Sequence, residues 1–302
     1  MITLISDPKN LVIIIRSKSF EAECTREDPW YGTKFSKEKF TESLFDLMRN
    51  PKLPEGCVGM PPVNTLLPEN LDIVAADSVN SSVPTLIKEW PGDTEVWFLK
   101  DDKFQRPKAF VSLKVYPHTG FLQELGKSAN GKVLADVWVQ CIKEYLREFI
   151  YMASMASLEV EISTVSEFVV IKFSGFNDSM PASVSQALNL ISEFSNVKEE
   201  QLRPIFNQVK EKLMQEWHNA YYEQSYSQAT SVFETIILSP SYEKRSLRAI
   251  LEGLTYEQFA ENLHRAPWVK NGRFVWFLHG NFSLATALEV TEKARSILLA
   301  TD

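Results

Sequence analysis

Runs of apolar residues predict several β-strands in this chain. Residues 11–16, Leu-Val-Ile-Ile-Ile-Arg, form a β-branched run that is typical of a buried strand. Such a strand must pair its backbone groups, so we expect its partners in a distant part of the chain or in sequence outside it. Two later runs, 158–164 and 167–174, are joined through Val165 and Ser166 and predict a hairpin. Further strands are predicted at 71–75, 95–100, 108–116 and 273–278.

Apolar residues that recur every three or four positions predict helices between these strands. The longest helix is expected from about residue 130 to 157, and another covers 199–217. Pro204 is tolerated only near the first turns, so the hydrogen-bonded part of this second helix should begin close to it. Other helices are predicted at 36–48, 182–194, 221–238, 242–251, 255–265 and 283–299.

A stretch rich in proline and glycine follows the predicted helix at 36–48. This density excludes a continuous helix or a central strand and predicts an extended linker. The residues concerned are Pro51, Pro54, Gly56, Gly59, Pro61, Pro62 and Pro68.

The order of the predicted elements favours an α+β fold. Grouped strands are followed by a long helix, a strand pair and a block of helices. This is not the strict strand–helix alternation of a parallel sheet. We therefore predict an antiparallel or mixed sheet that is covered by helices on one face.

Composition narrows the classes of function. An apolar content of 44% in 302 residues allows a sizeable core. The net charge of −7 argues against nucleic acid as a partner; the charge fits simple solubility, or an acidic chamber for cationic peptides. No apolar run approaches the roughly 18 residues that span a membrane, so no membrane partner is expected. The three cysteines form no CxxC pair, which favours a reducing, cytoplasmic location.

No motif predicts a catalytic or metal-binding residue. A zinc protease helix needs two histidines and a glutamate in the pattern His-x-x-Glu-His or His-Glu-x-x-His. Neither pattern occurs, and a Gly-x-Ser-x-Gly sequence and a glycine-rich phosphate loop are also missing. Cys141 lies on the apolar stripe of the long helix, so a buried inert thiol is favoured over a nucleophile. The four histidines are His118, His218, His264 and His279.

Some polar residues have both a structural and a functional interpretation. His279 is expected to hydrogen-bond to the backbone where a strand ends, with Asn281 or Ser283 capping the next helix. Tyr222 and Tyr226 are expected to pack as a helical pair, and the alternative is a peptide-binding surface. Two acidic pairs, favoured as solvated residues over acid–base groups, are Asp101-Asp102 and Glu199-Glu200.

Several short tracts, taken in order, resemble the insulinase/pitrilysin-type zinc metalloproteases. Each tract is weak alone, but together they span nearly the whole chain. The tracts are Ser17-Lys18-Ser19-Phe20, Trp30-Tyr31-Gly32-Thr33, Asn64 to Asn70, Val96 to Phe104 with Pro107-Lys108-Ala109, Gly175-Phe176-Asn177-Asp178 and Leu278-His279-Gly280-Asn281.

The resemblance implies a domain organisation. In this family, four related α+β domains form two bowl-shaped halves that close on a peptide. By resemblance, residues 1–33 are the C-terminal end of a preceding domain, 34–68 the linker between the halves and 69–302 a third domain. The family's zinc ligands and catalytic glutamate lie in its first domain, so no catalytic and no metal-binding residue is carried over to this chain.

The resulting hypothesis is a non-catalytic middle segment, linker plus chamber wall, of a zinc metalloendopeptidase that cleaves peptides. The resemblance implies peptide substrates and other domains of the same polypeptide as partners, with zinc only in the full-length parent. Lys103, Phe104 and Lys108 would shape a chamber or inter-domain surface, although a turn between two strands is the simpler interpretation. The alternative function is a non-enzymatic interaction scaffold derived from the same family.

Overall fold

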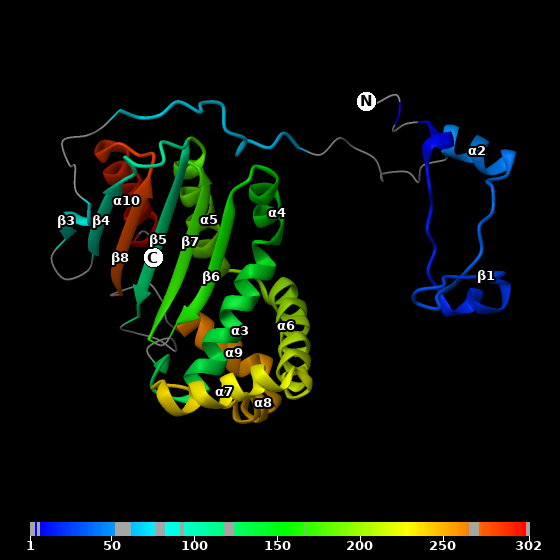
Figure 1. The fold of residues 1–302 in the computed structure, drawn as a ribbon. Coiled ribbons are helices and arrows are strands. Elements are labelled where there is room, and N and C mark those ends of the chain that lie inside the picture. Colours follow the sequence, from blue (N-terminus) through cyan, green and yellow to red (C-terminus); the bar gives the residue numbers. More distant parts are fainter. Residues whose placement is uncertain are drawn as a thin grey trace. The chain divides into compact units, whose positions relative to one another are not determined.

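The computed structural model describes residues 4, 7–51, 62–75, 82–90, 94–117, 124–165, 167–265 and 272–299. The chain divides into two compact units, Met1–Val63 and Asn64–Asp302 (Figure 1). Most of the predicted proline-rich linker, from Pro54 to Pro61, lies outside the described residues. No helix in the described ranges is long and apolar enough to cross a membrane.

The described residues of the first unit form only short elements. Two 3₁₀ turns, η1 (Pro8–Asn10) and η2 (Lys18–Glu23), precede an antiparallel pair formed by β1 (Arg26–Glu27) and β2 (Lys34–Phe35). Helix α2 (Glu42–Arg49) follows. Its cap is Thr41, whose Oγ1 accepts a hydrogen bond from the amide of Leu44 at 3.3 Å, so the helix begins later than the predicted residue 36.

The predicted buried strand at 11–16 is wrong. The whole segment is exposed and belongs to no strand, with Val12 at 85% and Ile14 at 71% exposure. β-branched residues favour an extended backbone, but a strand also needs a neighbour for its N–H and C=O groups. No described segment pairs with these residues.

In the described part of the chain, the second unit is built on a mixed sheet of six strands in the order β3-β4-β8-β5-β7-β6. Strands β4 and β8 are parallel, and the other neighbours are antiparallel. The predicted hairpin is confirmed in the pairing of Val165 with Phe168, while Ser166 lies outside the described residues. The strands are β3 (Thr85–Trp90), β4 (Thr94–Lys100), β5 (Lys108–Tyr116), β6 (Glu159–Val165), β7 (Phe168–Phe176) and β8 (Arg273–Gly280).

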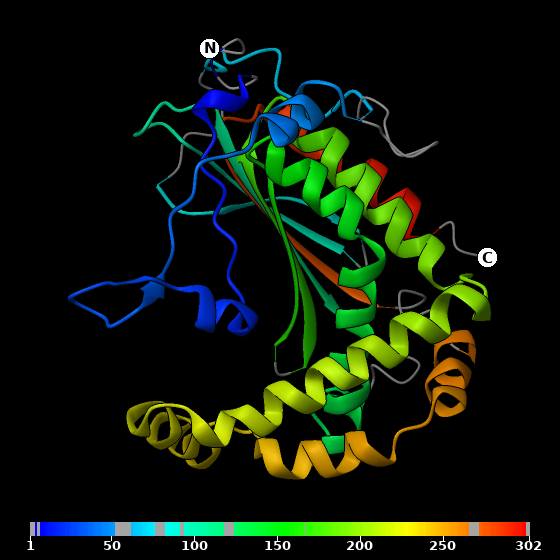
Figure 2. The same cartoon turned by 90° about the vertical axis from the view of Figure 1, so that its right-hand side faces the viewer.

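Helices cover one face of this sheet (Figure 2). Alternate strand residues on that face, such as Val96, Leu113 and Trp276, are fully buried in the core. The helices packed on the strands are α3 (Ala129–Tyr145), α4 (Arg147–Met155), α5 (Met180–Phe194) and α10 (Leu284–Leu299). The predicted α+β class, with a sheet covered by helices, is therefore confirmed.

Further helices form a second layer on α3. Helix α6 (Glu199–Asn219) packs on α3, and both α8 (Lys244–Gly253) and α9 (Tyr256–Arg265) pack on α6. A 3₁₀ turn, η4 (Ala220–Tyr222), links α6 to α7 (Ser225–Ile237). The side chains of α7 include large exposed apolar groups such as Phe233 and Ile236.

Several predicted boundaries differ from the structure. The helix expected over 130–157 is two helices that meet at Leu146. The helix expected over 221–238 is interrupted at Glu223 and Gln224. Helix α6 begins at Glu199, so Pro204 falls in its second turn and removes a single backbone donor there. The predicted strand at 71–75 does not form, and β3 was not predicted.

Candidate functional site

The strand ends that carry the predicted surface residues meet at one edge of the sheet. Lys100, at the end of β4, lies opposite Gly280, at the end of β8. Gly280 also lies opposite Ala109, near the start of β5. Lys108 pairs with Phe176, the last residue of β7. The connection from β4 to β5 must therefore pass over the end of β8, because β8 lies between them.

That connection is a tight turn held by Asp101. Its Oδ1 accepts hydrogen bonds from the backbone amides of Lys103 at 3.1 Å and Phe104 at 3.0 Å. Gln105 has a φ of 47°, in the left-handed region, which reverses the chain. The Phe104 side chain is 72% exposed. The simpler interpretation of this tract, a turn between two strands, is thus confirmed, and it presents an aromatic side chain to solvent.

Lys108 has a different environment from the turn residues. Its Nζ lies 5.4 Å from the centre of the Phe176 ring, a cation–π contact. Its carbonyl accepts a hydrogen bond from the Asn281 amide at 2.8 Å. The structure therefore places Lys103, Phe104 and Lys108 at one sheet edge, with Lys108 packed on the sheet.

Residues 64–75, called the strap below, run along the same edge and are held there by side chains. Asn281, 2% exposed, accepts a hydrogen bond on Oδ1 from the Val74 amide at 2.8 Å. Its Nδ2 donates to the Asp72 carbonyl at 2.9 Å and to Asn177 Oδ1 at 3.0 Å. The backbone groups of Asp72 and Val74 bond to side chains and not to a neighbouring strand, which explains why 71–75 is not a strand.

Further side chains along the strap complete these contacts. Lys100 Nζ donates to the carbonyls of Val74 and Phe282, each at 3.0 Å. Asp178 Oδ2 accepts from the amides of Glu69 at 2.8 Å and Asn70 at 3.0 Å. At the start of the strap, Asn64 Nδ2 donates to the carbonyl of Met152 at 2.7 Å.

Glycine is required at position 280, where the end of β8 lies close to the start of β5. Its φ is +119°, a conformation that L side chains rarely adopt. A Cβ at this position would lie 2.5 Å from the Lys108 carbonyl oxygen and 2.7 Å from Ala109 Cα. Both are backbone atoms, so neither can move aside cheaply.

The neighbouring polar residues have structural roles. His279 Nδ1 donates to the Leu99 carbonyl at 2.9 Å, and Ser283 Oγ accepts from the Thr286 amide at 3.0 Å, which caps α10. These two predictions are confirmed, whereas Asn281 fixes the strap. The predicted pair of Tyr222 and Tyr226 is wrong, because the helix breaks between them; Tyr222 packs against His218 with 5.4 Å between ring centroids.

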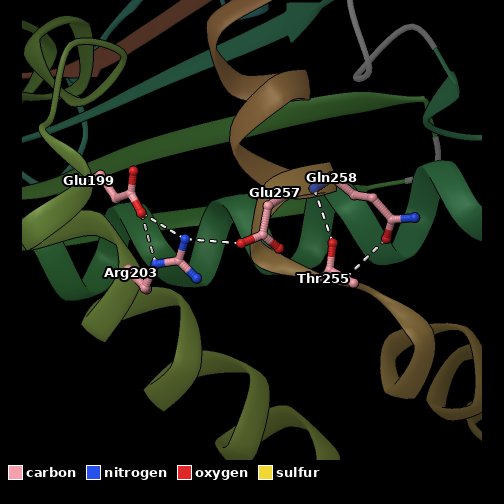
Figure 3. Close-up of polar contacts among 5 residues, drawn as sticks. All are labelled: Glu199, Arg203, Thr255, Glu257 and Gln258. Carbon is pink, nitrogen blue, oxygen red and sulfur yellow. Dashed lines mark hydrogen bonds and ion pairs between the residues drawn. The ribbon is translucent and has the colours of Figure 1, made fainter.

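Helix α9 is fixed to α6 by a cluster around Arg203 (Figure 3). Arg203 Nη2 lies 2.7 Å from Glu199 Oε1 and 2.9 Å from Glu257 Oε1, and its guanidinium is 4.1 Å from the centre of the Tyr256 ring. Helix α9 begins with a capping box, in which Thr255 and Gln258 exchange side chain–backbone hydrogen bonds at 3.0 and 3.2 Å.

The ionisation of this cluster follows from its geometry. Hydrogen bonds to Glu199 and Glu257 raise the pKa of Arg203. A bond to its own backbone amide, followed by the Arg203 guanidinium, holds the pKa of the Glu257 carboxyl below its usual range. Glu199 is thus a helix-start residue in an ion pair, which confirms the structural interpretation of that acidic pair.

The described residues do not fit a zinc ion. They contain no group of three or more His, Cys, Asp and Glu side chains that could hold a metal. His118 and the side chain of His264 lie outside the described residues. Cys141 is fully buried, and this burial raises the pKa of its thiol far above the ordinary value, as expected for an inert cysteine.

Comparison with known proteins gives consistent matches. A family model described as the middle or third domain of peptidase M16 matches residues 4–249. Insulin-degrading enzyme of Bos taurus is 24% identical over 292 residues, which are 97% of this chain and 27% of that enzyme. The A-factor-processing enzyme of Saccharomyces cerevisiae is 24% identical over 96% of this chain and 27% of its own length.

Other matches agree. Nardilysin of Rattus norvegicus is 25% identical over 83% of this chain and 21% of its own length. The crystal structure of pitrilysin superposes with a TM-score of 0.68 and 17% identity over 92% of this chain and 28% of that chain, which shows a shared fold. The chain thus spans about a quarter of the length of the curated relatives that it matches.

Proposed function

Because the chain belongs to the peptidase M16 family and matches its middle or third domain, we propose that it is the non-catalytic middle segment of a larger zinc metalloendopeptidase that cleaves peptides. The observation that carries this proposal is the match of residues 4–249 to that one domain, within relatives about four times longer. Zinc would be held by another part of the full-length protein. The parent's peptide substrates and its other domains would be the partners.

The proposed division of labour assigns residues 1–33 to the end of a preceding domain, 34–68 to a linker and 69–302 to a wall of the peptide chamber. The boundary between the two compact units, at Val63 and Asn64, falls inside the proposed linker and supports this division. The exposed apolar run at 11–15 also supports it, since such a run needs a sheet to pair with. In this proposal, the strap is the segment through which the linker joins the wall domain.

Metal content and peptide cleavage test the proposal directly. The isolated chain should bind no stoichiometric zinc and cleave no fluorogenic peptide, whereas the full-length parent should do both and lose activity with a chelator. One tightly held zinc per isolated chain, with chelator-sensitive cleavage, would contradict the proposal. A parent that lacks His-x-x-Glu-His and cleaves nothing would instead favour the scaffold function.

The turn that presents Phe104 is proposed to contact another domain or the chamber interior, together with Lys103 and Lys108. Support comes from the 72% exposure of Phe104 on a turn whose backbone donates two hydrogen bonds to Asp101. Alanine at Phe104 in the full-length enzyme should change peptide turnover without changing stability. Tyr151→Ala, at a 63% exposed position on α4, is the matched control. Wild-type turnover in the Phe104 variant would remove this assignment.

We also propose a cytoplasmic location. Within the described residues, Cys24 and Cys141 are free thiols, which is consistent with a reducing compartment. Fractionation of cells that make the full-length protein tests the location, and recovery with a secretory or organellar marker would contradict it.

A further inference from the structure

The sheet face opposite the helices is rich in aromatic side chains. Along β4 and β8, residues alternate between fully buried positions and half-buried ones, and the half-buried set includes Trp97 and Phe277. These two lie directly opposite each other on parallel neighbouring strands. The four helices that contact the strands cover the other face (Figure 2).

A hollow of about 390 Å³ lies on this face. Its size is within the range of sites that hold small ligands or single side chains. Ser112 lies opposite Phe277 in the register, on the side away from Trp97, so a small residue stands beside the Phe277 ring. The lining residues are Pro84, Trp97, Ser112, Lys114, Val275 and Phe277.

Lys114 gives the hollow one charged side. It is exposed, and its Nζ lies 5.2 Å from the centre of the Phe168 ring. Two cations on this face are paired with carboxylates, Arg273 with Glu95 and Lys172 with Glu161, whereas Lys108 lies over an aromatic ring as Lys114 does. Lys114 has no carboxylate partner in the described part of the chain. The hollow therefore combines apolar walls with a cation that has no carboxylate partner among the described residues.

We propose that this hollow binds the C-terminal residue of a peptide that ends in a bulky apolar side chain. The side chain packs against Trp97 and Phe277 and over Ser112, and the terminal carboxylate pairs with Lys114 Nζ. A C-terminal residue carries an apolar side chain and a carboxylate on the same Cα. These two groups match the apolar walls and the cation that line the hollow. The inference rests on the proposed function, because peptides are the ligands expected of the parent.

Fluorescence anisotropy with two labelled peptides tests the site. The first is fluorescein-Gly-Gly-Ser-Gly-Phe with a free carboxylate, and the second is the same peptide as its C-terminal amide. The 302-residue chain should bind the acid at least tenfold more tightly than the amide. Lys114→Gln should abolish this preference, whereas Lys172→Gln, which removes a cation already paired on the same face, should keep it.

A second variant tests the apolar part of the hollow. Ser112→Met places a larger side chain beside Phe277 and should weaken binding of both peptides at least tenfold. Circular dichroism and the unfolding midpoint identify any loss of folding. Equal affinity for acid and amide, or an unchanged preference in Lys114→Gln, would overturn the inference.

The same titration in the full-length protein separates a peptide site from a surface covered by another segment of the polypeptide. Binding to the isolated chain that disappears in the full-length protein would overturn the peptide site. If the full-length protein cleaves peptides but Lys114→Gln changes no affinity, the inference fails and the proposed function stands. If the full-length protein cleaves nothing while the acid preference persists, the proposed function fails alone.

Discussion

Asn281 positions a segment that lies far away in sequence. Its amide bonds to Val74 and Asp72, which precede it by 207 and 209 residues. The group is buried, so each of these hydrogen bonds forms away from competing water. Loss of the side chain would leave a backbone N–H and a carbonyl of the strap without partners. The free-energy cost of these two unsatisfied groups exceeds that of losing an exposed hydrogen bond.

Replacement of Asn281 by alanine should therefore lower the free energy of unfolding by about 1–3 kcal/mol. Urea denaturation followed by circular dichroism measures the change. Asn219→Ala, at an exposed position at the end of α6, should change it by less than about 0.5 kcal/mol. Equal midpoints for the two variants would show that the strap does not depend on Asn281.

Two glycines provide a matched test of backbone geometry. Gly280→Ala adds a methyl group against backbone atoms at a φ of +119° and should cost about 2–4 kcal/mol of stability. Gly253→Ala meets nothing within 4 Å at the end of α8 and should be neutral or stabilising by up to about 1 kcal/mol. Thermal unfolding measures the stability of both variants. A Gly280→Ala protein as stable as the wild type would contradict the close approach of Gly280 to the backbone of Lys108 and Ala109.

At the scale of single residues, the sequence pointed to residues that hold the strap but did not predict which groups they contact. Asn281, Lys100 and Asp178 all fall in tracts that resemble the insulinase/pitrilysin family. Their convergence on the strap depends on strand order, because β4, β7 and β8 end at one edge. The sequence did not predict that Trp97, Lys114 and Phe277 line one hollow, because they lie on three different strands.

At the scale of elements, α9 depends on a contact at its first turn. Arg203 connects α6 to Glu257 and stacks on Tyr256, while the capping box satisfies the free amides of α9. Exposed ion pairs contribute little to global stability, so this cluster should act locally, on opening of the helix end.

Arg203→Gln should accelerate amide hydrogen exchange in α9 while the global unfolding midpoint stays nearly constant. Lys212→Gln, which removes an ion pair within α6 alone, is the control. Because the pKa of Glu257 is lowered in the folded protein, its contribution is present above the ordinary carboxyl pKa and is lost as the pH falls through the folded value. Unchanged α9 exchange in Arg203→Gln would rule out this role.

Element prediction succeeded where one face of an element is buried. Helix 182–194 and strands 95–100 and 108–116 have such a face, and α5, β4 and β5 match them closely. Prediction failed where tertiary contacts decide the conformation. Residues 11–16 and 71–75 have strand composition without a paired strand, and the break at Leu146 interrupts a stripe whose apolar pattern continues through it.

At the scale of the whole molecule, stability resides in the second unit. Among the described residues, the hydrophobic core cluster begins at Leu66 and includes no residue of the first unit. The short elements of residues 1–63 bury few side chains. The free energy gained from this burial is too small to offset the conformational entropy that the segment loses on folding.

A protein that begins at Pro62 should therefore unfold cooperatively with the same midpoint as the full 302 residues. Calorimetry and urea denaturation measure this. As a control, removal of residues 62–75 as well should lower the midpoint, because it also removes the strap. Loss of a cooperative transition in the first truncation would show that the first unit takes part in the core.

The order of the strands also governs biosynthesis. The strand at the centre of the sheet, β8, pairs Leu99 with His279, 180 positions later, so it is translated long after its neighbours. Until then, β4 and β5 each present a bare edge to other nascent chains. A polypeptide that stops before residue 273 keeps both edges permanently and should form intermolecular aggregates. Solubility in the cell should thus depend on β8, the last of these six described strands to leave the ribosome.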